Sequence, residues 1–231
     1  MYDFHISAGQ RSKHIFIMNS SVLLFFVSNV LATVLLGGRF VIRNDRLFRY
    51  FGIGLLLDAA AFAMWTIGYV NPEQLLTFIT FGAVAFLASL VVFLYASLER
   101  VPATTRLLVT VLGAVAVAGI FYVGRYVDPA DASISPEGFL FFNLTPFVQM
   151  LYTFALALIT LPVIDLVASK FRAPYSALLR YGLIAEVVGG VMLITSKDAQ
   201  TLYITGWIIG IVYAALWLTL IFNKRAWSGA D

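Results

Sequence analysis

Long apolar runs separated by short polar segments are the dominant pattern of this chain. The runs cover roughly residues 15–37, 48–70, 74–98, 105–126, 138–166, 175–196 and 200–222. Each has about the 20 residues that a helix needs to cross the hydrocarbon core of a bilayer. The pattern therefore predicts an all-α integral membrane protein, in which a bundle of seven transmembrane helices forms a single domain over residues 1–231.

The composition favours the same class. Hydrophobic residues make up 61% of the 231 positions and charged residues 12%, and the mean hydropathy is +0.92. A soluble domain has roughly half apolar and about a quarter charged residues. Seven spans leave no room for a soluble catalytic or DNA-binding domain, and the absence of cysteine excludes disulfides and thiolate chemistry.

The positions of the basic residues predict an orientation. Eleven of the 15 Lys and Arg residues flank the runs on one side, namely Arg39, Arg43, Arg46, Arg49, Arg100, Arg106, Lys170, Arg172, Arg180, Lys224 and Arg225. The other side has only Arg11, Lys13, Arg125 and Lys197. Because basic residues in short loops stay in the cytoplasm, we expect an outer N-terminus and an inner C-terminus in the cell membrane. The basic charge is then a topology signal, and we expect the bilayer rather than nucleic acid as the partner.

The order of the runs has the symmetry of a 3+1+3 parallel repeat, with the fourth run as a linker. A short turn at 71–73 joins the second and third runs, and another at 196–198 joins the sixth and seventh. Asp58 lies thirteen residues before Asn71, and Glu186 lies twelve before Asp198, so both acids occupy nearly the same depth. Any seven-helix chain has this directional symmetry, so a repeat and a simple bundle both stay open.

Asp58 and Glu186 are the strongest candidates for a functional site. An acid in the middle of a span costs about 2.5–3.5 kcal/mol on insertion scales, so it usually faces the bundle interior or water. One glycine lies a turn before Glu186 and two lie a turn after it, while Trp65 lies two turns beyond Asp58. These acids suit a proton or cation site, but they equally suit a buried hydrogen bond between helices.

The fifth run has a second polar pattern. At 100° per residue one stripe contains Pro146, Gln149, Thr153 and Thr160, with Asn143 and Tyr152 on its flanks. Such a stripe predicts either the wall of a ligand cavity or hydrogen bonds that link helices. In the seventh run Gly206, Gly210 and Ala214 form a ridge of small residues, which permits tight helix crossing within the bundle or in a homodimer.

Missing residues exclude several cofactors. All four lysines lie at or beyond the ends of the runs, so a retinal Schiff base has no residue. The two histidines, His5 and His14, lie outside the bundle core, which excludes a bis-histidine haem and a helical zinc site. We expect no cofactor and no metal, and no enzymatic activity because no nucleophile and base can be paired.

Residues 61–69, which read AFAMWTIGY, are an Ala-rich helix segment with Trp and Gly near its outer end, followed by a short turn. This segment resembles the second and third helices of the seven-helix sensor modules at the N-terminus of some bacterial histidine kinases. The resemblance covers about the first three helices, together with overall size and topology. We expect no kinase domain after the seventh run, so the resemblance implies a detached sensor that signals through a partner membrane or signalling protein.

Two classes of function follow. The first is a receptor-like or accessory protein that binds a small or apolar ligand or docks a membrane partner. The second is a small secondary transporter coupled to protons or cations through the two acids. The scarcity of strongly polar, broken helices favours the first. For either class the expected ligand or ion pathway contains Asp58, Glu186, Gln149, Thr153, Asn143 and Trp65.

Overall fold

Each apolar run forms one long helix in the computed structural model, which describes residues 19–129, 131–195, 200–223 and 227. The helices are α1 (Ser20–Val41), α2 (Arg46–Val70), α3 (Leu75–Ser97), α4 (Ala103–Tyr122), α5 (Pro146–Ala168), α6 (Tyr175–Thr195) and α7 (Gln200–Phe222). Seven helices in the described chain are long and apolar enough to cross a membrane. The all-helical fold of a multi-pass membrane protein is thereby confirmed.

Several residues used in the sequence analysis lie outside the described residues. They are His5, Arg11, Lys13, His14, Ser196, Lys197, Asp198, Lys224 and Arg225.

The fifth span is shorter than its apolar run. Helix α5 begins at Pro146, and residues 138–145 are not helical, so this part of the prediction is wrong. Strands β1 (Asp131–Ile134) and β2 (Leu140–Asn143) instead form an antiparallel hairpin. Its turn requires the positive φ of 83° at Gly138. The Thr145 hydroxyl caps α5 by accepting from Val148 N, and Pro146 follows at the first helical position, so local capping sets the start of the helix.

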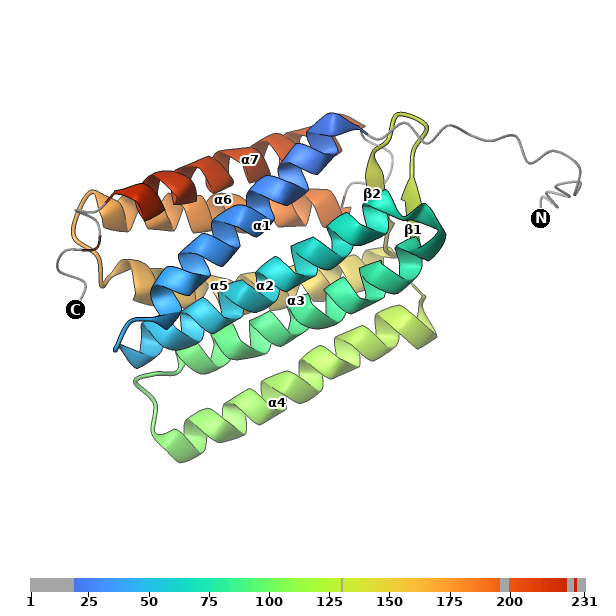
Figure 1. The fold of residues 1–231 in the computed structure, drawn as a ribbon. Helices are drawn as coiled ribbons and strands as arrows, with labels where there is room; N and C mark the ends of the chain where they lie inside the picture. Colours follow the sequence, from blue (N-terminus) through green and yellow to red (C-terminus); the bar gives the residue numbers. More distant parts are fainter. Residues whose placement is uncertain (1–18, 130, 196–199, 224–226, 228–231) are drawn as a thin grey trace, which may run out of the picture.

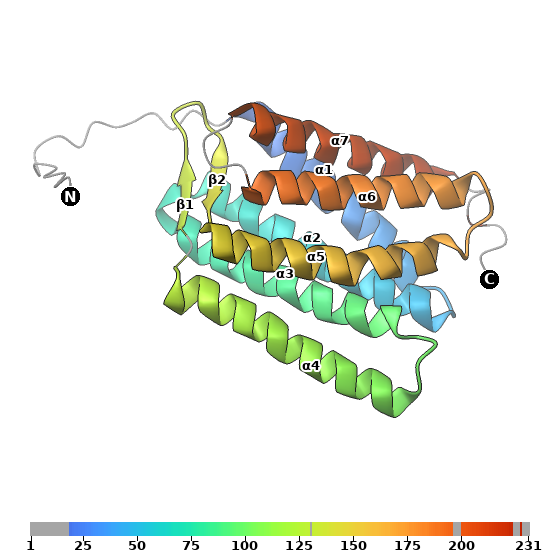
Figure 2. The ribbon, with the colours of Figure 1, turned by 180° about the vertical axis from the view of Figure 1, so that it is seen from behind.

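The seven helices lie roughly side by side, and the β-hairpin lies at one end of the bundle, here called the hairpin end (Figures 1 and 2). The α1–α2, α3–α4 and α5–α6 connections lie at the opposite end, here called the arginine-rich end. A 3₁₀ turn, Pro72–Gln74, joins α2 to α3 at the hairpin end, and a π-helical turn, Val123–Val127, extends α4. Helix α4 lies at the edge beside α3, and Val117 is its only buried residue.

The buried apolar side chains form two clusters. The larger one extends from the middle of the bundle to the arginine-rich end and includes Phe40, Phe51 and Trp217. The smaller one lies toward the hairpin end and includes Phe26 and Leu140. Burial of such side chains from water gives part of the stability, and close packing fixes how the helices cross.

Small residues let α6 and α7 approach closely. A Cβ atom added to Gly189 would lie 3.1 Å from the carbonyl oxygen of Gly206, and one added to Gly206 would lie 3.1 Å from that of Gly189. A Cβ atom at Gly210 would lie 2.2 Å from the ring of Phe25 in α1. The glycine ridge of α7 therefore packs inside the bundle, which is one of the two uses expected from the sequence.

Candidate functional site

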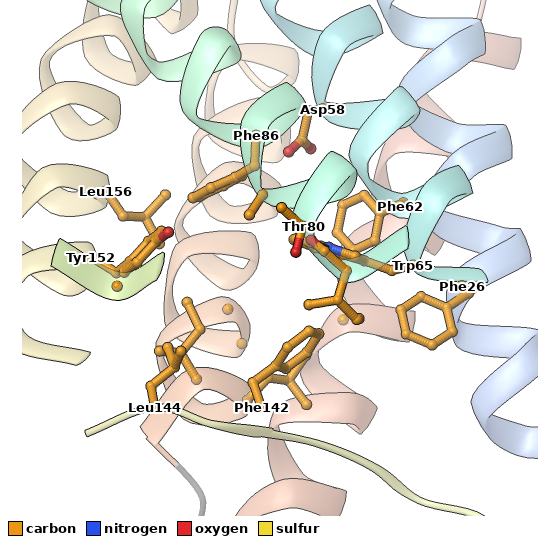
Figure 3. Close-up of a pocket in the computed structure, with 18 of the residues that line it drawn as sticks. Phe26, Asp58, Phe62, Trp65, Thr80, Phe86, Phe142, Leu144, Tyr152 and Leu156 are labelled. Carbon is orange, nitrogen blue, oxygen red and sulfur yellow. Dashed lines mark hydrogen bonds between the residues drawn. The ribbon is translucent and has the colours of Figure 1, made fainter. Parts of the chain in front are cut away.

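A cavity of about 150 Å³ lies inside the bundle between its middle and the hairpin end. Its walls are mostly apolar, with many aromatic side chains, and come from all seven helices and both strands (Figure 3). The aromatic members are Phe25, Phe26, Phe62, Trp65, Phe86, Phe121, Phe142, Tyr152 and Tyr213. Exposed residues at the hairpin end, Arg125 and Asp131, also line it, so the cavity reaches the surface there.

The two predicted acids meet at the inner end of this cavity. Asp58 of α2 and Glu186 of α6 both line it, and their carboxyl groups lie within electrostatic range of each other. Asp58 is 4% exposed, and its Oδ2 atom has no hydrogen-bond partner in the described chain. Figure 3 shows its carboxyl group directed into the space that Phe86, Trp65 and Tyr152 surround. A buried carboxyl oxygen without a donor is costly, so this atom is available to a bound group.

Tyr213 of α7 adds a third polar group to the acid pair. It lines the cavity, and its side chain is 2% exposed. The hydroxyl lies within electrostatic range of both carboxyl groups and has no hydrogen-bond partner among the described residues. Three helices thus place three hydrogen-bonding side chains at one point in an otherwise apolar interior.

A second cavity of about 30 Å³ lies on the other side of the acids. Asp58 and Glu186 line both cavities, and Thr160 of α5 lines only the smaller one. The Thr160 hydroxyl donates to the carbonyl oxygen of Leu156 within its own helix. A volume of this size holds one water when polar groups surround it, and here the acids and the hydroxyl provide them. The acid pair therefore separates a larger cavity from a smaller one.

Trp65 lies in the cavity wall as predicted for a pathway residue. Its ring packs edge-on against Phe62 and Phe142, with centroid distances of 5.4 and 5.5 Å. The indole Nε1 donates to the carbonyl oxygen of Ile79 over 3.4 Å. A Cβ atom on Gly82 would lie 2.2 Å from that nitrogen, so a glycine at this position leaves room for the indole.

The remaining predicted residues do not line either cavity. Gln149 donates from Nε2 to the carbonyl oxygens of Leu144 and Ile194, at 3.2 and 3.1 Å, so it links α5 to the end of α6. Thr153 is half-buried, and its hydroxyl has no partner in the described chain. Asn143 lies on β2 rather than on α5, where it is exposed and donates to the Ser133 hydroxyl over 3.0 Å.

Sequence reasoning missed most of the aromatic wall. Phe62, Phe86 and Phe142 give no signal in the sequence beyond their apolar character, because a Phe in an apolar run faces lipid or protein equally well. Tyr213 carried a detectable signal, since a tyrosine in the middle of a span has a hydroxyl that needs a partner. Among the described residues no cluster of three or more His, Cys, Asp or Glu side chains is placed to hold a metal ion.

The chain matches no protein-family model, and no curated protein is significantly similar to it. The chemistry of the cavity is therefore the basis for assigning a function.

Proposed function

We propose that the protein is a receptor-like or accessory membrane protein that binds a small apolar molecule in the cavity. The observation that carries the proposal is the apolar cavity of about 150 Å³, with aromatic side chains in its walls and with the buried Asp58 and the half-buried Glu186 at its inner end. Ligand sites in proteins are concave and mostly apolar, with a few converging polar groups. A purely structural pair of acids would need no cavity beside it.

The volume limits the size of the ligand. An engineered apolar protein cavity of about 150 Å³ binds benzene, so a molecule with one ring or a short branched chain fits here. Such molecules partition into the bilayer, and from the bilayer surface they can reach the opening of the cavity at the hairpin end. Leu76 and Thr80 of α3 also line the cavity. Leu76 is exposed and Thr80 is half-buried, which leaves this side accessible.

Binding of toluene to the protein in nanodiscs of phosphatidylcholine tests the proposal. We expect saturable binding by calorimetry after the signal of empty nanodiscs is subtracted. Ala83 lines the cavity, so Ala83→Trp should fill it and weaken binding at least ten-fold. Val84 on the same helix is 48% exposed and does not line the cavity, so Val84→Trp is the matched control and should bind normally. Absence of saturable binding to the unmodified protein would contradict the proposal.

The orientation and the signalling role belong to the same proposal. The basic residues at the arginine-rich end support placing that end in the cytoplasm of the cell and the cavity mouth outside. A ligand entering from outside would then be sensed by the bundle, and a partner membrane or signalling protein would transmit the signal. The 3+1+3 parallel repeat agrees with the pairing of one acid from α2 with one from α6.

A second candidate function is that of a small proton- or cation-coupled transporter. The observation that favours it is the position of Asp58 and Glu186 between two cavities. Transporters place coupling sites near the bilayer midplane, between regions that open alternately to the two sides. Pro162 lies in α5 near the smaller cavity and interrupts backbone hydrogen bonding there, which favours a bend in this helix.

A further inference from the structure

We propose that the ligand of this cavity is an apolar amine, bound as a cation with its ammonium group on Asp58 and Glu186 and its apolar part against the aromatic wall. This inference rests on the proposed function and specifies the chemistry of the bound molecule. Its basis is the charge and hydrogen-bonding capacity at the inner end of the cavity.

The acid pair has unused acceptors. Two acids within electrostatic range of each other in a low-dielectric interior do not both ionise readily, so the pair favours a single negative charge. Asp58 Oδ2 has no hydrogen-bond partner among the described residues. An ammonium group has three donors and no acceptor, which complements carboxyl oxygens.

The acid pair also has no cation of its own within the described part of the chain. Neither Asp58 nor Glu186 forms an ion pair with a described basic residue. The ion pairs in the described chain join Asp45 to Lys170 and Asp165 to Arg180. Among the described residues, the only basic side chain that lines the cavity is Arg125, which is exposed at the mouth. A buried negative charge without a partner is costly, so a cationic ligand would be stabilised here and an anionic one repelled.

The walls agree with a cation that carries an apolar group. Phe62, Trp65, Phe86 and Tyr152 line the cavity together with Asp58. The faces of aromatic rings attract ammonium groups, and their surfaces also bury an attached ring or alkyl chain. A hydrocarbon ligand would use the walls but leave the carboxyl group of Asp58 without a donor, and a neutral hydroxyl would supply a donor but no charge.

Three probes of similar shape separate these contributions: benzylamine, which is a cation at neutral pH, benzyl alcohol, which donates one hydrogen bond, and toluene, which donates none. We expect benzylamine to bind the protein in phosphatidylcholine nanodiscs at pH 7 at least ten-fold more tightly than either neutral probe. Asp58→Asn and Glu186→Gln should remove this preference and retain toluene binding, which also reports an intact cavity.

Asp165→Asn is the matched control, because it removes an acid that pairs with Arg180 outside the cavity. It should preserve the preference for benzylamine. If toluene binds and benzylamine binds no more tightly than benzyl alcohol, the amine inference is overturned while the proposed function stands. If none of the probes binds, the proposed function itself fails. The comparison of probes on the unmodified protein decides both questions, even where a variant does not fold.

Discussion

Asp45 shows how one side chain connects two loops at the arginine-rich end. Its carboxylate accepts from Leu47 N at 2.8 Å, which caps α2, and from Lys170 Nζ at 3.0 Å, which lies after α5. Partial burial raises the pKa of this carboxyl group, but the hydrogen bonds from Lys170 and the backbone outweigh it and hold the pKa below its ordinary value. The charged form is thus favoured in the folded protein.

Two substitutions of Asp45 should separate the cap from the ion pair. Asn caps as well as Asp, so Asp45→Asn should lose only the partly exposed ion pair, worth about 0.2–1 kcal/mol of unfolding free energy. Asp45→Ala should lose about 1 kcal/mol more because the cap is also removed. Unfolding by sodium dodecyl sulfate in mixed micelles, followed by circular dichroism, measures both.

The pH dependence provides the check on this assignment. Because the folded-state pKa is depressed, the stabilisation by the Asp45 charge is present above the unfolded-state pKa of about 3.9. It is lost as the pH falls through the lower folded-state value. The stability difference between the unmodified protein and Asp45→Asn should therefore close below about pH 4. An equal difference at pH 7 and at pH 2.5 would show that the ion pair is not its cause.

At the scale of elements, the hairpin is tied to the bundle by one buried tyrosine. Tyr69 of α2 is fully buried, and its hydroxyl donates to the carbonyl oxygen of Gly138 over 2.6 Å. The Tyr69 hydroxyl oxygen in turn accepts from the backbone N–H of Asn19 over 2.9 Å. One hydroxyl thus joins the end of α2, the hairpin turn and the start of α1. Since Phe142 of this hairpin lines the cavity, the tie also holds part of the cavity wall.

Tyr69→Phe should loosen the hairpin while leaving the helices in place. The substitution removes two hydrogen bonds, which costs about 1–3 kcal/mol when the remaining groups are left unsatisfied. Hydrogen exchange of the hairpin amides, for example that of Phe139, should become faster, and exchange in the middle of α2 should not change. Tyr122→Phe is the control, because Tyr122 is 58% exposed. Unchanged hairpin exchange would mean that other contacts hold this element.

The limits of sequence reasoning are clearest in the elements around the site. Helix α7 covers 200–222 as predicted, whereas the first part of the fifth run contains strand β2. Hydropathy measures apolar content and not backbone conformation. Periodicity places Gln149 on one face of α5 but does not tell which neighbour that face meets, and the neighbour is the end of α6. Asp58 and Glu186 were recognisable singly, while their meeting depends on how α2 and α6 pack.

At the scale of the whole molecule, the acid pair lies between the two cavities. Asp58 and Glu186 are the only described polar residues that line both. They come from different helices, with Thr160 on the far side. In a receptor this pair fixes the ligand at the closed end of a pocket. In a transporter the same pair would exchange a proton for a cation as the bundle opens to the other side.

A flux measurement distinguishes these two whole-molecule functions, given that amines bind. Benzyltrimethylammonium has a permanent charge and does not cross bilayers unaided, so it suits proteoliposomes with an acidic interior. It has no N–H donor, so its binding to the protein in nanodiscs, through charge and the aromatic walls alone, is measured first. A proton-coupled exchanger should accumulate the radiolabelled cation above the level of empty liposomes. Asp58→Asn and Glu186→Gln should then reduce the initial rate at least ten-fold, because neither amide releases a proton, whereas Asp165→Asn should retain it. Binding of the cation without protein-dependent uptake would exclude the exchanger and leave the receptor-like function, since a receptor needs only one open side.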